Sequence, residues 1–446
     1  MDFVIIGGDA AGMSAASRAK RNMPELNVHV LEMTRDVSYS ACGMPYNIAD
    51  PKRELDDLVV RQAEVFRKKQ GINLLTDHCV EKISPDNKIV SGNTVKGKPF
   101  SFSYDKLLIA TGSSSIVPDI PGISHQGVMS LKSLDDGRKL KSYLTKNNVK
   151  KAVIIGMGYI ALEMCEALVE RGIKVDMVKP RAGLLPWLEP TMSDVVREEV
   201  KSKGVGIYDG YKIEQIEKTD TGLSLICSDI ELNGDMIITA VGVKPNSRLA
   251  EDAGLKLSIA GSIAVNKQML TSDTNIFSAG DCADAVHVVT NQKTWIPLAL
   301  RANRAGWAAA DNAWGRKIQL PGIVGTAVFK VFDLQVARTG LNVKEAENAG
   351  FEPVEVMIKA RSRAHSHPGN CPILVQITGD KKSGRLLGMQ IVGKEGAAHR
   401  INAPAAALHA NMSVEQFSQI DMAYAPPFGP TWDPMLTAAN QLLKKL

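Results

Sequence analysis

A glycine-rich turn between a buried strand and a helix occurs twice in this 446-residue chain, starting at Gly7 and again 149 residues later at Gly156. This strand–turn–helix order is typical of nucleotide-binding α/β units. From about residue 325 the pattern changes to alternating strands mixed with helices, which is typical of an α+β domain. The sequence therefore predicts an α/β protein with two Rossmann-like dinucleotide-binding domains and a C-terminal α+β domain.

The first unit consists of an apolar strand over 3–6, a helix over 13–21 and a second strand over 28–31 that ends at Glu32. In such a unit the backbone and the helix N-terminus bind a diphosphate, and the acid at the end of the second strand hydrogen-bonds a ribose. Glu32 is the expected ribose ligand. The expected loop contacts are Gly7, Gly8, Ala11 and Gly12.

Three charged residues of this unit need separate interpretation. Asp9 stands where the fingerprint has its middle glycine, and an acid beside a diphosphate is unfavourable unless it points away. Arg18 and Arg21 follow the loop on the predicted helix. They indicate either a solvated helix face or phosphate contacts to an anionic substrate.

The second unit repeats the pattern with a strand over 152–155, a helix over 160–171 and a strand over 174–178. Its expected loop contacts are Gly156, Gly158, Tyr159 and Ile160. The strand is followed by Lys179 and Arg181, where an NAD site would carry an acid. Cations suit a ribose 2′-phosphate, so the pattern favours NADPH, with NADH as the alternative if both side chains are solvated.

A single cysteine, Cys42, lies between these two units in the stretch Ser38-Tyr39-Ser40-Ala41-Cys42-Gly43-Met44-Pro45-Tyr46. Gly43 and Pro45 predict a turn into a helix, and a helix N-terminus would lower the pKa of the thiol. Asn47 stands where a second cysteine would permit an internal disulfide. If Cys42 does redox chemistry, it does so without that partner.

Composition excludes several classes of function. The net charge of +5 is spread along the chain without a Lys/Arg stripe, which argues against nucleic-acid binding. No apolar run is long enough to span a membrane, and no signal peptide is visible. The six cysteines form no C-x-x-C pair, so a reducing, cytoplasmic location is expected. The pair His365 and His367 lacks further ligands, so no metal site is expected.

Three further segments occur in a fixed order: Ala110-Thr111-Gly112, residues 240–246 and residues 274–281. Together with the two glycine turns they resemble the pyridine nucleotide-disulfide oxidoreductases, flavoproteins with two dinucleotide sites, over essentially the whole chain. The resemblance implies FAD in the first unit, with Asp281 on its ribitol. It implies further cofactor contacts from Ser38, Thr111, Gly112, Gly242, Gly280 and Ala299.

The segment from Cys42 to Tyr46 resembles the coenzyme A-disulfide reductase and NAD(P)H polysulfide/persulfide reductase branch of that family. A C-terminal segment, Ala423-Tyr424-Ala425-Pro426-Pro427-Phe428, also matches this branch, in which the tyrosine reaches the active site of the partner subunit. The branch often has a second tyrosine where this chain has Ser366 and His367. The resemblance thus implies a homodimer, with Tyr424 and His367 as candidate catalytic residues and coenzyme A as a possible bound substrate or product.

The same resemblance sets the expected domains: FAD-binding over 1–118 and 245–324, NAD(P)H-binding over 119–244, and dimerisation over 325–446. In the last domain we expect strands over 326–331, 354–360, 373–378 and 386–392, and helices over 342–349 and 397–409.

The expected function is FAD-dependent reduction of a small disulfide, persulfide or polysulfide by NAD(P)H through Cys42. Arg18, Arg21 and Ser38 are the expected substrate contacts. Two alternatives stay open at this stage. One is an oxidase or peroxidase in which Cys42 cycles through sulfenic acid, and the other is an electron-transfer subunit for another protein.

Overall fold

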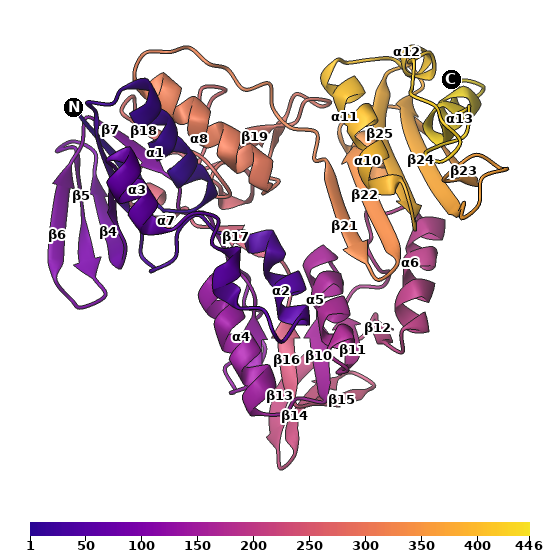
Figure 1. Cartoon of the computed structure of the whole chain (residues 1–446), viewed down its shortest axis with the longest axis horizontal. Helices are drawn as coiled ribbons and strands as arrows, with labels where there is room; N and C mark the ends of the chain where they lie inside the picture. Colours follow the sequence, from indigo (N-terminus) through magenta and orange to yellow (C-terminus); the bar gives the residue numbers. More distant parts are fainter.

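The computed structural model describes all 446 residues. Three five-stranded sheets organise the chain. In Figure 1 the N-terminal unit with α1 and α8 lies on the left, the C-terminal sheet on the right, and the second α/β unit below and between them. This arrangement confirms the predicted α/β class with a separate C-terminal α+β part.

The first sheet is parallel, with the order β18-β7-β1-β2-β3. Its central strand β1 pairs with β2 on one side and with β7 on the other. The strands are β1 (Asp2–Ile6), β2 (Asn27–Leu31), β3 (Asn73–Leu75), β7 (Lys106–Ile109) and β18 (Ile276–Ser278). Because β18 comes from a distant part of the sequence, two separate segments of chain build this unit.

Helices α1 (Ala10–Asn22) and α8 (Ala299–Ala313) pack against each other beside this sheet. A Cβ on Gly306 would lie 2.2 Å from the carbonyl oxygen of Ala11, so glycine permits the close approach of the two helices. The remaining elements of the unit are α3 (Ala63–Gln70), α7 (Arg248–Asp252) and an antiparallel sheet of β4 (His78–Ser84), β5 (Ile89–Thr94) and β6 (Pro99–Ser103).

The second sheet is also parallel, with the order β12-β11-β10-β16-β9. Its strands are β9 (Val128–Ser130), β10 (Lys151–Ile155), β11 (Lys174–Lys179), β12 (Gly206–Asp209) and β16 (Met236–Thr239). The helices of this unit are α4 (Leu134–Lys146), α5 (Tyr159–Glu170) and α6 (Pro190–Ser202). A small antiparallel sheet holds β13 (Ile213–Thr219), β14 (Gly222–Cys227) and β15 (Glu231–Gly234).

A short antiparallel pair joins the two units. Strand β8 (Ser113–Ser115) leaves the first unit and pairs with β17 (Val243–Pro245), which returns to it. The chain therefore crosses between the units at one place. The domain boundaries expected from the sequence lie close to this pair and stay a prediction.

The C-terminal sheet is antiparallel, with the order β21-β22-β25-β24-β23. Four of its strands fall where the sequence predicts them, and the fifth, β22, was not predicted. The strands are β21 (Ala327–Val331), β22 (Leu334–Gly340), β23 (Pro353–Arg361), β24 (Pro372–Asp380) and β25 (Leu386–Gly393). The helices are α9 (Val343–Asn348), α10 (Ala397–Arg400), α11 (Asn402–His409), α12 (Val414–Ser418) and α13 (Pro434–Leu442).

The prediction of one helix over 397–409 is wrong in one respect, because the structure divides it into α10 and α11. Pro404 lies in the first turn of α11 and has no N–H to continue the ladder from α10. No helix of the structure is long and apolar enough to cross a membrane.

Candidate active site

The loop between β1 and α1 has no room for side chains. A Cβ on Gly7, where φ is 107°, would lie 2.2 Å from the carbonyl oxygen of Ala110, and one on Gly12 would lie 1.9 Å from that of Gly7. Helix α1 has no side-chain cap, and its first backbone bond runs from Met13 N to Asp9 O at 2.9 Å. The first three N–H groups of α1 are therefore free, which fits the diphosphate of a dinucleotide.

Two acids border this loop, and both are turned into the protein. Glu32 accepts hydrogen bonds from Gly8 N at 2.7 Å and from Thr34 N at 2.8 Å. Asp9 does not cap α1 and instead accepts from Tyr39 N at 3.3 Å. Burial raises the pKa of Asp9 to about 6. The acid in the glycine loop is thus bonded to the segment before Cys42.

The second loop repeats this geometry at the start of α5. A Cβ on Gly156 would lie 2.3 Å from the carbonyl oxygen of Ala240, whereas one on Gly158 would meet no atom within 4 Å. Helix α5 also has no side-chain cap, and its first backbone bond runs from Leu162 N to Gly158 O. The free N–H groups therefore belong to the first turn, which holds the predicted contacts Tyr159 and Ile160.

The two cations at the end of β11 differ in whether a partner within the chain already binds them. Lys179 donates through Nζ to the carbonyl oxygen of Gly183 at 2.6 Å, and burial lowers its pKa. Arg181 is exposed and forms no ion pair. Asp209, the last residue of the neighbouring strand β12, is bound bidentately by Arg197 at 2.9 and 3.0 Å. Arg181 is therefore the cation that is free to bind a ligand here.

The remaining predicted cofactor residues gather where the chain crosses between the units. Asp281 accepts from Ser113 Oγ at 2.9 Å and lies 3.4 Å from Lys132 Nζ. Thr111 donates through Oγ1 to the carbonyl oxygen of Asn246 at 2.6 Å, close to Gly112 and Gly242 on the crossing segments. Lys132 was not predicted, because no motif marks it.

Cys42 is exposed and lies in a short 3-10 turn, Ala41–Gly43, that runs directly into α2 (Met44–Ala49). Asn47 is fully buried and donates to the carbonyl oxygen of Glu54 at 2.7 Å. The position where a second redox thiol would stand is thus filled by a structural side chain.

The sequence predicts a lowered pKa for the Cys42 thiol, and this prediction is wrong. Burial raises the pKa of this thiol, and the charge of Glu163 raises it further, while Lys132 opposes them. Helix α2 has only six residues, so its dipole is short. The position of Cys42 before a helix is correct, but burial of the thiol, and after it the charge of Glu163, raises its pKa.

Glu163 is a site residue that the sequence analysis missed. It lies one turn after Tyr159 on α5 and accepts from Tyr46 Oη at 3.0 Å. Burial raises the pKa of Glu163 to about 7. Two acids, Glu163 and Glu166, in the apolar middle of a helix whose third acid, Glu170, is its exposed last residue are the signal that sequence reasoning could have used.

The two predicted C-terminal residues lie in adjoining segments. Ala364 N donates to the carbonyl oxygen of Pro426 at 3.1 Å, which joins the loop of His367 to the segment of Tyr424. Arg400 holds both segments by donating to the carbonyl oxygens of Ser362 and Phe428, each at 3.1 Å. Tyr424 is half exposed, and its hydroxyl forms no hydrogen bond within the chain.

The predicted substrate cations on α1 also differ. Arg18 binds Asp311 on α8 with two bonds of 3.0 and 2.9 Å. Arg21 is exposed and has no carboxylate partner. Of the two, only Arg21 is free for a phosphate, and Arg18 links α1 to α8.

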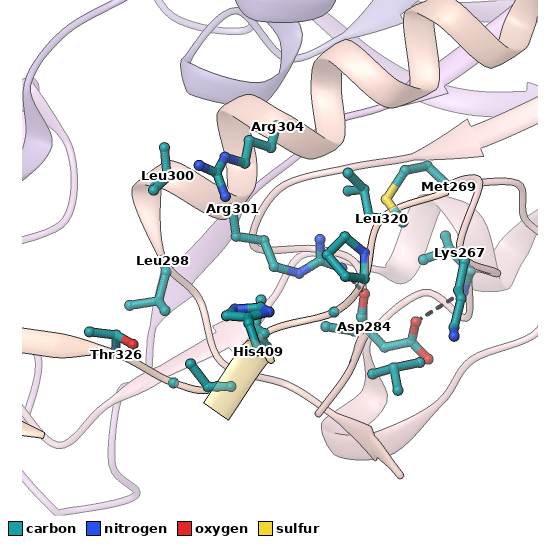
Figure 2. Close-up of a pocket in the computed structure, with 18 of the residues that line it drawn as sticks. Lys267, Met269, Asp284, Leu298, Leu300, Arg301, Arg304, Leu320, Thr326 and His409 are labelled. Atoms are coloured by element: carbon teal, nitrogen blue, oxygen red, sulfur yellow. Dashed lines mark hydrogen bonds between the residues drawn. The ribbon is translucent and has the colours of Figure 1, made fainter. Parts of the chain in front are cut away.

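A cavity with a volume of about 290 Å³ lies beside the start of α8, where Ala299 is part of its wall. Figure 2 shows Arg301 reaching across it toward Asp284, with His409 of α11 close by. Helix α8 has no side-chain cap, so the N–H groups of its first turn, including that of Ala299, are free. Cys42 is not part of this cavity.

Comparison with known proteins places these features in a family. The model of the pyridine nucleotide-disulphide oxidoreductases matches residues 1–306, and the model of their dimerisation domain matches residues 326–435. A curated relative from Pyrococcus abyssi, named NAD(P)H sulfur oxidoreductase (CoA-dependent), is 38% identical over 98% of this chain and 97% of its own. An NADH oxidase from Methanocaldococcus jannaschii is 31% identical over 100% of this chain and 99% of its own.

Among solved structures, an NAD-dependent persulfide reductase from A. fulgidus superposes with a TM-score of 0.96 at 35% identity. The match covers 100% of this chain and 83% of that one.

Proposed function

Because the chain belongs to the pyridine nucleotide-disulphide oxidoreductase family, as its sequence predicts, we propose that it reduces a low-molecular-weight disulfide, persulfide or polysulfide with NAD(P)H. The observation that carries this proposal is Cys42, exposed between two nucleotide-binding loops with no second thiol beside it. Since Asn47 fills the place of that thiol, the sulfur that pairs with Cys42 comes from the substrate.

The residues present fit FAD in the first unit. Free N–H groups at α1 would hold the diphosphate, Glu32 a ribose, and Asp281 with Ser113 and Lys132 the ribitol. When bound there, FAD carries reducing equivalents from the nicotinamide to the sulfur on Cys42. The protein supplies position and charge.

The second unit would hold NADPH. Its uncapped helix α5 and Gly158 leave open space for the nucleotide diphosphate, and Arg181 is the free cation at the end of β11. The relative from Pyrococcus abyssi is named for NAD(P)H, and the solved persulfide reductase is described as NAD-dependent. NADH is therefore the competing cofactor.

In the proposed cycle the Cys42 thiolate attacks one substrate sulfur, a bond forms between these two atoms, and the second substrate sulfur leaves as a thiolate. Tyr424 of the partner subunit gives that thiolate a proton. Two electrons from NADPH then break the new bond and restore Cys42. His367, which lies in the loop against the Tyr424 segment, is the proposed second proton donor.

Arg21 and Ser38 would contact a substrate that carries phosphate groups, such as coenzyme A, and Arg18 would position α1 against α8. The name of the Pyrococcus abyssi relative includes coenzyme A, which supports this substrate class. An oxidase is the second candidate, favoured by the NADH oxidase relative.

Replacement of Cys42 by serine tests the proposal. We expect turnover of coenzyme A disulfide, coenzyme A persulfide and polysulfide, measured without oxygen, to fall about 1,000-fold, because the attacking thiolate is lost. Cys371→Ser, at another partly exposed thiol, is the control and should retain activity. Full sulfur reduction by Cys42→Ser would refute the thiolate mechanism, and turnover with oxygen alone would favour the oxidase.

A further inference from the structure

Glu163 is a partly buried carboxylate without a cation. Its only hydrogen bond is the one it accepts from the hydroxyl of Tyr46, at 3.0 Å, and no basic side chain lies within ion-pair distance. Its neighbour one turn along α5, Glu166, is bound by Lys330 and accepts from Phe332 N at 2.6 Å. A buried acid is normally paired in this way, so an unpaired one at a redox centre needs an explanation.

Tyr46 connects this acid to the redox cysteine. Residues 41–49 form one continuous helical segment, because the 3-10 turn that holds Cys42 runs directly into α2. Cys42 and Tyr46 are four residues apart and therefore lie on the same face, one turn from each other. Helix α2 packs against α5, and this contact brings Glu163 to the hydroxyl of Tyr46.

The charged groups around this face come from several elements. The charge of Glu163 raises the pKa of Cys42, and Cys42 in turn raises the pKa of Tyr46 and Tyr159. Lys132, Asp281 and Asp9 act on Cys42 from the first nucleotide unit and the segment before α4. Glu166 and its partner Lys330 complete the set on α5 and β21. An ionised Glu163 thus has no opposite charge of its own to balance it.

From this arrangement we infer that Glu163, placed near Cys42 by its hydrogen bond to Tyr46, controls the ionisation of that cysteine, which becomes a thiolate only when Glu163 is neutral. Glu163 is therefore a positioning residue, which acts on the reaction through the ionisation of Cys42. The inference rests on the proposed function in so far as Cys42 is the thiol that attacks the substrate.

The proton balance of the cycle is consistent with this role. Reduction of the bond between Cys42 and the substrate sulfur takes two electrons and yields two thiolates. The hydride of NADPH and one proton from water together supply the two electrons and two protons that leave with the two substrate thiols, so Glu163 keeps its proton through the cycle. Cys42 can then remain an anion beside a neutral carboxyl group, ready for the next attack. When Glu163 loses its proton, repulsion favours the thiol form of Cys42.

The test is the ionisation of Cys42 in the reduced holoenzyme, followed by the pH dependence of its alkylation with iodoacetamide and corrected with a Cys42→Ser sample. Glu163→Gln removes the charge and keeps an acceptor for Tyr46. We expect its alkylation midpoint to lie at least one pH unit lower than that of the native protein. The matched control is Glu170→Gln, which removes the same charge from the exposed end of α5 and should leave the midpoint unchanged.

Tyr46→Phe provides a second variant in case Glu163→Gln loses FAD. Without the donated hydrogen bond the pKa of Glu163 rises, the acid stays neutral to higher pH, and the alkylation midpoint again falls. Equal midpoints for the native protein, Glu163→Gln and Tyr46→Phe would overturn the inference. Loss of the proposed function would appear differently, as sulfur reduction that persists in Cys42→Ser.

Discussion

Lys179 and Arg181 follow the same strand, yet the structure leaves only Arg181 free to bind a ligand. Lys179 is held by the carbonyl oxygen of Gly183, and Arg197 is held by Asp209. Of these three cations, Arg181 would therefore break the fewest existing contacts if it bound a 2′-phosphate.

Arg181→Ala tests the choice of nicotinamide cofactor at this residue. We expect the KM for NADPH to rise about tenfold, the loss of one exposed charge contact worth about 1.4 kcal/mol, with little change for NADH. Steady-state kinetics with both cofactors give the comparison, and Lys174→Ala at the far end of β11 is the control. An equal effect on NADH and NADPH would show that Arg181 does not bind the 2′-phosphate.

At the scale of elements, α5 connects the redox face to the C-terminal sheet. Its first residue, Tyr159, lies with its ring 6.2 Å from that of Phe329 on β21. Further along the helix, Glu166 binds Lys330 and the backbone N–H of Phe332 at the β21–β22 turn. The helix that carries Tyr159 and Glu163 is therefore held in place by the hairpin of the C-terminal domain.

Glu166→Ala should weaken this connection, because it leaves the N–H of Phe332 without an acceptor and Lys330 without its partner. We expect a loss of about 2 kcal/mol, seen as a fall of about 4 °C in the first thermal transition of the holoenzyme. Lys330→Ala should cost less, since its side chain is half exposed. If both variants have the same first transition temperature as the native protein, the contact contributes nothing to stability.

Some elements could be predicted from the sequence because their signals are local. Gly7, Gly12 and Gly156 occur where the backbone leaves no room for a Cβ, and these positions revealed both nucleotide loops. Strand β22 gave no such signal, since the turn before it places Phe332 at a φ of 51° without a glycine.

The same distinction applies to the candidate site. Cys42 could be identified from the sequence, because a cysteine is chemically distinctive and Gly43 and Pro45 predict the turn that holds it. The Glu163–Tyr46 bond and the Arg18–Asp311 pair depend on how distant helices pack, so sequence reasoning missed the first and assigned Arg18 to the substrate.

At the scale of the whole molecule, the C-terminal segment that carries Tyr424 has an unusual surface. Tyr424, Phe428 and Trp432 are 50%, 81% and 64% exposed, although monomers seldom leave such a cluster of large aromatic side chains uncovered. The match to a dimerisation domain over residues 326–435 includes this segment. A second copy of the chain is the partner that would cover it.

Mixing two inactive variants tests whether Tyr424 acts across that interface. If Tyr424 serves the partner's Cys42, a dimer of one Cys42→Ser chain and one Tyr424→Phe chain contains one intact site and one doubly altered site. Random exchange of subunits should then restore about a quarter of the native number of sites, because half of the dimers are mixed and each holds one working site of two. If Tyr424 serves the Cys42 of its own chain, every site in the mixture carries one substitution and no activity returns. Activity measured before and after subunit exchange distinguishes the two arrangements, and Phe428→Ala, which removes a large exposed contact, should weaken the dimer in either case.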